Sequence, residues 1–332
     1  MNRWLVRGFI LFSVTGLLPT MALSQEGNVD EAREALARQE GDEDSSKQLE
    51  EVFQAAETSY SLQKKGTHSL NYSFDYSYTG DQRLDLAITD GSVRNLDVVP
   101  SATHNFTNAF SYDYGLLDNL TVGARIPLVV KYDTQDELNI YDFGDISATA
   151  RWQPFAYVPG KMSTTVFGTF TTKTGVSPYE IDIDEQLSTG SGYYSVAGGV
   201  SFSKVLDPVV VFGSTSATYN LPERDLQQVR GARVLQELEP GFGLSGSAGF
   251  AYDISLSISA QLSYSDQTIL SFSDGTQAVA QDQMSGFLSM SLGTRVSDTT
   301  IVNTSLGIGL TEDAPDFSLG VSLPIRFSGL KE

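Results

Sequence analysis

The sequence predicts an all-β fold: a twelve-stranded antiparallel transmembrane β-barrel, preceded by a short N-terminal helical region that would plug the lumen. Three observations predict it. Apolar side chains fall on alternate positions in segment after segment from His68 onward. No run of about 18 apolar residues follows the N-terminus, which excludes a helical membrane protein but not a barrel, whose strands are only half apolar. The connections between the strands also alternate between short and long.

The N-terminus has the layout of a secretory signal peptide. Arg3 and Arg7 give a basic start, and the apolar run Gly8–Pro19 is too short for a spanning helix. Small residues at Ala22 and Ser24 place a cleavage site after residue 24, with a cut after Ala22 and an uncleaved anchor helix as the alternatives. The signal peptide is therefore expected to be 1–24, and the location is the bacterial outer membrane.

Composition narrows the class of partner and excludes a disulfide framework. The full chain carries a net charge of −20, and removal of the signal takes away two more arginines. Such acidity argues against nucleic acid, whose phosphates need a basic surface. The chain has no cysteine, which a closed sheet tolerates because every strand has two neighbours. The expected partners are outer-membrane lipid and lipopolysaccharide, and no cofactor is expected.

The region before the strands reads as helix in two pieces. The piece 25–44 is an acidic, partly helical segment, and the piece 45–65 is an amphipathic helix whose start, Ser45 followed by Gln48, is a possible capping box. Apolar residues at i, i+3, i+4 and i+7 give that helix one apolar stripe. The stripe consists of Leu49, Val52, Phe53 and Ala56.

The barrel is expected over 66–328, with a tail at 329–332. Each predicted strand is long enough to cross an outer membrane when tilted. The strands are expected around Leu70–Tyr78, Phe106–Tyr114, Leu120–Val130, Ile146–Trp152, Met162–Phe170, Tyr194–Phe202, Val209–Tyr219, Phe242–Tyr252, Ile254–Tyr264, Met284–Leu292, Val302–Leu310 and Phe317–Phe327. The facing of Val209–Tyr219 stays ambiguous, because its start is apolar on both faces.

The alternative is a soluble β-sandwich or a lipocalin-like barrel. A soluble protein would turn its polar face to water, and such a face usually carries many charges. Here the polar face is mostly Ser, Gly, Thr and Asn, and aromatic residues gather near the strand ends as they do at membrane interfaces. The long connections are expected to be outer loops and the short ones periplasmic turns.

Alternation also predicts which charges face the lumen. Six charged side chains from the first four strands and the last one fall on the polar face, so one wall is expected to be charged. They are Asp75, Asp113, Arg125, Asp145, Arg151 and Arg326. The opposite wall offers mainly Ser and Gly, for example Ser257 and Ser259.

These faces suggest how the helix would plug the barrel. Glu50 and Glu51 would pair with the lumenal arginines, while the apolar stripe would pack on the smooth parts of the wall. The alternative is that the helix packs against itself or a partner in the periplasm.

No catalytic constellation stands out. Neither His68 nor His104 has a serine two residues away on its own strand face, as a lipase-like pair would need. We therefore expect no enzyme. The acidic residues Asp182, Asp184 and Glu185 in an outer loop could gather Ca²⁺, although a solvated acidic loop is the favoured interpretation.

Two segments carry a family resemblance. EVFQAAETSYSLQKKGTHSLNYSFDYSY (Glu51–Tyr78) joins a helix to an aromatic strand, and GDISATARWQPF (Gly144–Phe155) ends a strand in a Trp-Gln-Pro-Phe turn. Together they resemble the outer-membrane channel that exports functional-amyloid subunits in the Fap system, within the MetA-pathway phenol-degradation barrel family.

The resemblance implies a trimer of twelve-stranded barrels with a periplasmic coiled coil and a plug that matches Ser45–Leu62. The chain departs from this pattern because Val29–Gln39 is much too short for a trimerising coiled coil. The first function expected is a gated exporter of polypeptide of the amyloid-subunit type. The alternatives are a diffusion channel for small hydrophobic or aromatic solutes and, with a closed lumen, a structural barrel.

Overall fold

The computed structural model describes residues 62–89, 92–158, 160–182, 185–252, 256–297 and 300–325, with the backbone alone at 81–101. All of them belong to one compact unit, Asp42–Glu332. The signal peptide, most of the expected helical region and the C-terminal tail lie outside the described residues. At the end of that helical region, residues 62–65 are described and form no helix.

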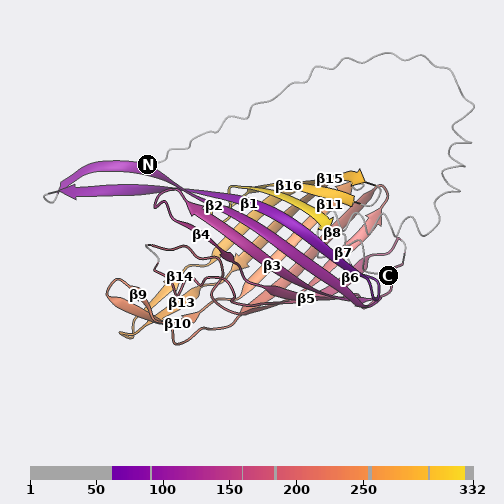
Figure 1. Cartoon of the computed structure of the whole chain (residues 1–332), viewed down its shortest axis with the longest axis horizontal. Helices are drawn as coiled ribbons and strands as arrows, with labels where there is room; N and C mark the ends of the chain where they lie inside the picture. The colour runs from indigo at the N-terminus through magenta and orange to yellow at the C-terminus, as the bar shows by residue number, and fades with distance from the viewer. Residues whose placement is uncertain are drawn as a thin grey trace, which may run out of the picture. The chain divides into compact units, whose positions relative to one another are not determined.

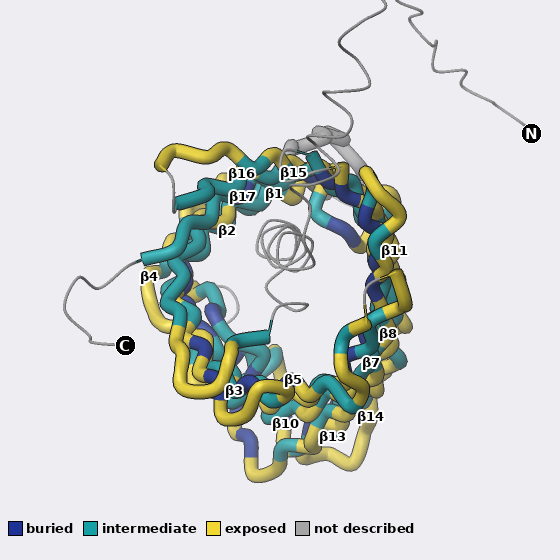
Figure 2. The backbone as a smooth tube through the Cα atoms, turned by 90° about the vertical axis from the view of Figure 1, so that its right-hand side faces the viewer, coloured by how far each residue is buried: buried dark blue, intermediate teal, exposed yellow. Residues whose placement is uncertain are grey.

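Twelve described strands form a closed antiparallel ring, seen end-on in Figure 2. In ring order they are β1 (His68–Thr89), β2 (Ser92–Leu117), β3 (Leu120–Asp133), β5 (Ser147–Trp152), β6 (Ser163–Thr171), β7 (Ser195–Leu206), β8 (Val209–Asn220), β11 (Gly243–Tyr252), β12 (Leu256–Ser265), β15 (Gln283–Ser297), β16 (Thr300–Gly309) and β17 (Phe317–Ile325). The ring closes where β1 pairs with β17, from Leu70 opposite Ile325 to Tyr78 opposite Phe317. The predicted twelve-stranded barrel is confirmed.

The outer face of the ring is apolar. Leu288, Met290, Leu306 and Ile308 on β15 and β16 are 37–51% exposed, while the residues between them, Ser289 and Gly307, lie on the inner face. A closed sheet satisfies every backbone hydrogen bond without water, so it can present such a face to lipid. The chain is thus a β-barrel of the bacterial outer-membrane type. Among the described residues, no helix has the length and apolarity to cross a bilayer.

The expected loops contain more strand than alternation predicted. β1 and β2 continue as a paired hairpin well beyond the ring, where a loop was expected over Gly80–Ala102 (Figure 1). A short strand, β4 (Asn139–Phe143), pairs with the C-terminal half of β3, while β5 pairs with its N-terminal half. The chain breaks between β4 and β5, around Gly144, so β4 lies in the region that was expected to be an outer loop.

Two further outer loops form a second sheet, which was not predicted. It has four strands in the order β14 (Gln277–Ala280), β13 (Thr268–Phe272), β10 (Arg233–Glu239) and β9 (Gln228–Arg230). Figure 1 shows it at the same end of the barrel as the tip of the β1–β2 hairpin. Its core is an apolar cluster in which Leu235 and Leu238 are fully buried. The two loops therefore share a hydrophobic core of their own at this end of the barrel.

Candidate functional site

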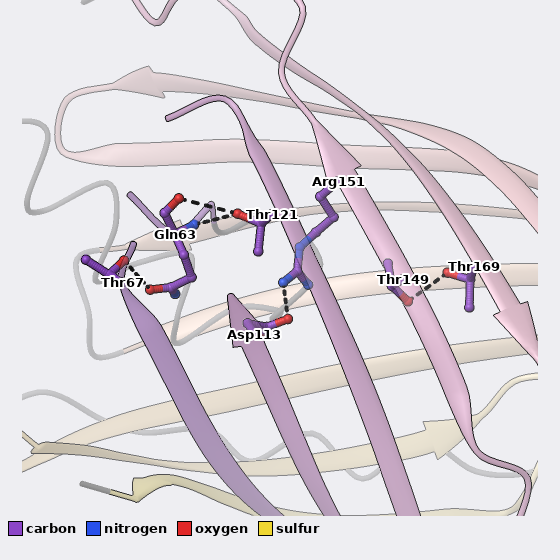
Figure 3. Close-up of polar contacts among 7 residues, drawn as sticks. All are labelled: Gln63, Thr67, Asp113, Thr121, Thr149, Arg151 and Thr169. Carbon is purple, nitrogen blue, oxygen red and sulfur yellow. Dashed lines mark hydrogen bonds and ion pairs between the residues drawn. The ribbon is translucent and has the colours of Figure 1, made fainter. Parts of the chain in front are cut away.

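The lumen is the candidate site, and it contains a buried ion pair. Arg151 on β5 donates to the Asp113 carboxylate on β2, and each side chain is only 6% exposed (Figure 3). The two side chains reach across β3, where Gly123 lies opposite Asp113 in the register. An added Cβ at Gly123 would collide with the carboxylate. The ion pair therefore depends on a glycine at this position.

The chain enters β1 from the inner side of the same wall. The backbone N–H of Gln63 donates to Oγ1 of Thr121 at 2.8 Å, and Thr121 is fully buried on the inner face of β3 (Figure 3). Farther along, the Lys65 N–H donates to Asp118 in the short β2–β3 turn at 3.2 Å. The N–H of Gly66 donates to the Gly115 carbonyl at 2.8 Å. Residues before β1 are thus fixed at the short-turn mouth of the lumen.

A cavity of about 340 Å³ lies between this segment and the wall. Its lining includes Gln63, the Asp113–Arg151 pair and Arg125, all from one side of the barrel. Hydroxyl and amide side chains of β1, β2, β5, β6, β16 and β17 line the rest of it, together with apolar residues such as Phe167, Ile301 and Leu323. We refer to it as the inner cavity.

A second cavity of about 410 Å³, the outer cavity, lies toward the loops. Asp75, Arg125 and Lys131 line it from the barrel wall, and Thr189 to Ser191 line it from the β6–β7 loop. The loop therefore reaches the lumen and narrows its outer end. Arg125 is the one described residue that lines both cavities.

Asp145 holds that loop in place. Its carboxylate accepts hydrogen bonds from the Gly175 N–H at 3.0 Å, the Ser191 N–H at 2.6 Å and the Ser191 hydroxyl at 2.7 Å. An added Cβ at Gly175 would lie 2.7 Å from Gly190 Cα, so the two ends of the loop meet at paired glycines. Asp145 thus lines the outer cavity and also holds the β6–β7 loop in place, a contact that alternation did not predict.

The β6–β7 loop also binds the second sheet, and we call the two together the outer cap (172–194 with β9, β10, β13 and β14). Nζ of Lys173 donates to the Glu223 carboxylate at 2.6 Å, which raises the pKa of Lys173. Tyr179 and Tyr193 pack on the apolar cluster of the sheet, and their burial raises the pKa of both phenols.

The wall opposite the charges is lined by serine and glycine. Serine hydroxyls pair between neighbouring strands, Ser214 with Ser247 at 2.7 Å and Ser259 with Ser289 at 2.8 Å. Ser257 lies on the same face of β12 as Ser259 and is 8% exposed. Because the hydroxyls satisfy one another across neighbouring strands, this part of the wall is polar without a charged side chain at these positions.

One part of the lumen wall is apolar. Val210 and Phe212 on β8 and Ala251 on β11 form a cluster in which each residue is at most 6% exposed, with Val205 and Tyr157 against it. The Phe212 ring lies over Gly249, where an added Cβ would be 2.7 Å away. The facing of β8, which the sequence left ambiguous, is thus resolved. Val210 and Phe212 face inward, and Val211 faces outward at 37% exposure.

Both histidines lie among aromatic side chains, His104 toward the loop end of β2 and His68 at the short-turn end of β1. Nδ1 of His104 is 2.9 Å from the Tyr76 hydroxyl, and its ring contacts Tyr78 and Tyr132. His68 stacks on Tyr112. In the acidic loop, Asp182 and Glu185 share one turn, and Asp184 lies outside the described residues.

Several expected site residues fall outside the described residues. Two other residues lie in the lumen, although they were not predicted from the sequence. Arg326 and the whole plug stripe with Glu50 and Glu51 belong to the first group. Lys131 and Thr121 belong to the second, although both fall on the same inward period of β3 as Arg125. The signal was present for these two, whereas nothing in the sequence marked the backbone contact of Gln63.

Comparison with known proteins supports the fold. No family model matches the chain. The COG4313 outer-membrane channel of Pseudomonas putida F1 is 16% identical, with a TM-score of 0.57 over 82% of this chain and 99% of that one. The translocator domain of the autotransporter NalP from Neisseria meningitidis is 12% identical, with a TM-score of 0.43 over 90% and 98% of the two chains. By its fold, the chain is similar to outer-membrane barrels.

Proposed function

We propose that the protein is a gated outer-membrane channel for small solutes. The observation that carries the proposal is the pair of lumenal cavities, about 340 and 410 Å³, which meet at Arg125. Cavities of this size suit small molecules. The outer cap narrows one end of this path, and the segment before β1 occupies the other mouth. In this proposal the chain transports and performs no chemistry of its own.

The gate is proposed to be the segment that precedes Gln63. Gln63 is bonded to the inner face of β3, so the chain before it starts from the lumenal side of the wall. The apolar cluster around Val210 and Phe212 offers a surface for the stripe Leu49, Val52, Phe53 and Ala56. Glu50 and Glu51 would pair with Arg151, since a guanidinium carries five N–H donors and can serve more than one carboxylate.

A second candidate is export of polypeptide, as the resemblance to the Fap channel implies. The serine and glycine wall from β8 to β15 favours it, because small hydroxyl side chains let an extended chain slide without a fixed binding site. For this cargo the outer cap would have to swing open, which requires release of the Asp145 clamp. A homotrimer stays a prediction of that resemblance.

The experiment that separates these candidates is transport by the purified full-length protein in liposomes. Small solutes should enter at a rate that depends on the protein, while an unfolded polypeptide of several kilodaltons should stay excluded. Release of the polypeptide, with a D145N variant faster than the wild type, would instead support export. Liposomes that stay impermeable to both would reject the channel.

A further inference from the structure

Arg125 lies at the junction of the two cavities, and this inference rests on the proposed channel function. Arg125 is the residue that the inner and outer cavities share, and its side chain is exposed inside the barrel. A solute that moves from one cavity to the other must pass this guanidinium. The residue at such a junction determines which solutes pass.

Along this path, the anionic side chains accept hydrogen bonds from the protein, whereas two of the cationic side chains do not form such contacts within the described residues. The Asp145 carboxylate accepts three hydrogen bonds from the β6–β7 loop, and Asp75 accepts one from the Ser73 hydroxyl at 3.1 Å. Arg125 and Lys131 make no hydrogen bond or close ion pair within the described residues. Asp75 attracts Arg125, and Asp145 attracts Lys131, only at longer range.

These cations are arranged along the path and not across it. Arg125 and Lys131 lie on the same face of β3, six residues apart, which is about 20 Å along a strand. Lys131 lines the outer cavity alone, whereas Arg125 reaches both cavities. An anion that enters from outside would therefore meet Lys131 first and Arg125 next. Another cation of this wall, Arg151, is held by Asp113.

We propose that the lumen selects small organic anions and that Arg125 binds their carboxylate group. A guanidinium matches a carboxylate with two parallel N–H donors, which favours this anion over a simple point charge. The inner cavity adds hydroxyl donors, such as Ser111 and Thr149, and an apolar surface from Phe167 and Ile301. That combination suits a short-chain organic acid better than an inorganic ion.

The first test measures binding of butyrate to the folded full-length protein in detergent. Binding should weaken about fivefold in R125Q, the size expected for loss of one solvated charge contact, and R125K should recover part of it. The matched control is R224Q, since Arg224 is a 74% exposed arginine in the β8–β9 loop that is paired with Glu237. Equal butyrate binding by the wild type and R125Q would overturn the proposal.

The second test measures ion selectivity in planar bilayers under a gradient of potassium butyrate. The wild type should prefer the anion, R125Q should lose most of that preference, and D75N should strengthen it. A preference for potassium in the wild type would overturn the inference while leaving the channel itself intact. Butyrate binding that depends on Arg125 without any conductance would instead reject the proposed channel and keep the site.

Discussion

Asp113 and Arg151 form a buried ion pair across an intervening strand, over the one position where β3 has no side chain. Asp113 lies opposite Gly123, and Arg151 lies opposite Thr121, so the contact runs diagonally over β3. This contact ties three neighbouring strands together near the short-turn mouth of the lumen. It also lies beside the bond from Gln63 to Thr121, which fixes the start of the barrel.

Removal of one member of this pair should destabilise the barrel strongly. D113N or R151Q leaves a charge buried without its partner, which costs about 3–5 kcal/mol. The double variant should lose less than either single variant, because no unpaired charge remains. Urea unfolding of the detergent-folded barrel measures the difference. The exposed pair Arg224–Glu237 is the control, and its loss should cost less than about 1 kcal/mol.

Gly123→Ala should act like a loss of the ion pair, since the new Cβ would occupy the place of the Asp113 carboxylate. We expect a lower unfolding midpoint than in the wild type. The matched control is Gly198→Ala on β7, where an added Cβ meets no atom within 4 Å. Equal midpoints for both variants would show that the carboxylate does not lie over Gly123.

Alternation predicted the ring but not the contacts made within it. The faces of Ser257, Ser259 and Arg125 followed from the two-residue period alone, because only one of the two facings turns the apolar side chains of a strand toward lipid. For Asp145, alternation predicted a lumenal side chain but not its hydrogen bonds from Gly175 and Ser191, because these depend on how the β6–β7 loop folds back.

The outer cap was missed for a different reason. β9 has three residues and β14 has four, which is too short for a periodic signal. Their pairing depends on contacts between loops far apart in the sequence, such as Gln228 to the carbonyls of Pro178 and Ile181. The pair Asp113–Arg151 likewise requires the register of three strands, which alternation on one strand does not supply.

The facing of the strands can be tested with one substitution on each face of the barrel. Leu306→Arg places a charge on the lipid side and should cost about 2–4 kcal/mol at mid-membrane depth, enough to block assembly. Ser259→Arg places the same charge on the lumen side, where it meets water, and should be tolerated. Heat-modifiable migration on a gel measures assembly. Equal yields for the two variants would mean that the register is wrong.

Alkaline pH should loosen the outer cap before it unfolds the ring. The pKa of Lys173 is raised above 10.5 by the hydrogen bond with Glu223, so its contribution is complete below that pH and is lost as pH rises through the raised pKa. The pKa values of Tyr179 and Tyr193 are also raised, so the unfolded cap loses these protons first, from about pH 10.

Hydrogen exchange over 172–194 measures this effect. Protection should fall over a pH window that begins at about pH 10, while the ring strands stay protected. K173M should show reduced protection already at pH 8. A cap whose protection is the same on both sides of this window would contradict the roles of these three side chains.

The most direct test of a gated channel is single-channel recording with the segment before β1 removed. The full-length protein and a variant lacking Gln48–Gln63 are compared in planar bilayers, after heat-modifiable migration has shown that both barrels are folded. We predict that the deletion raises both the conductance and the open probability. A folded barrel whose conductance and open probability are unchanged by the deletion would contradict the account, because the segment would then not close the lumen.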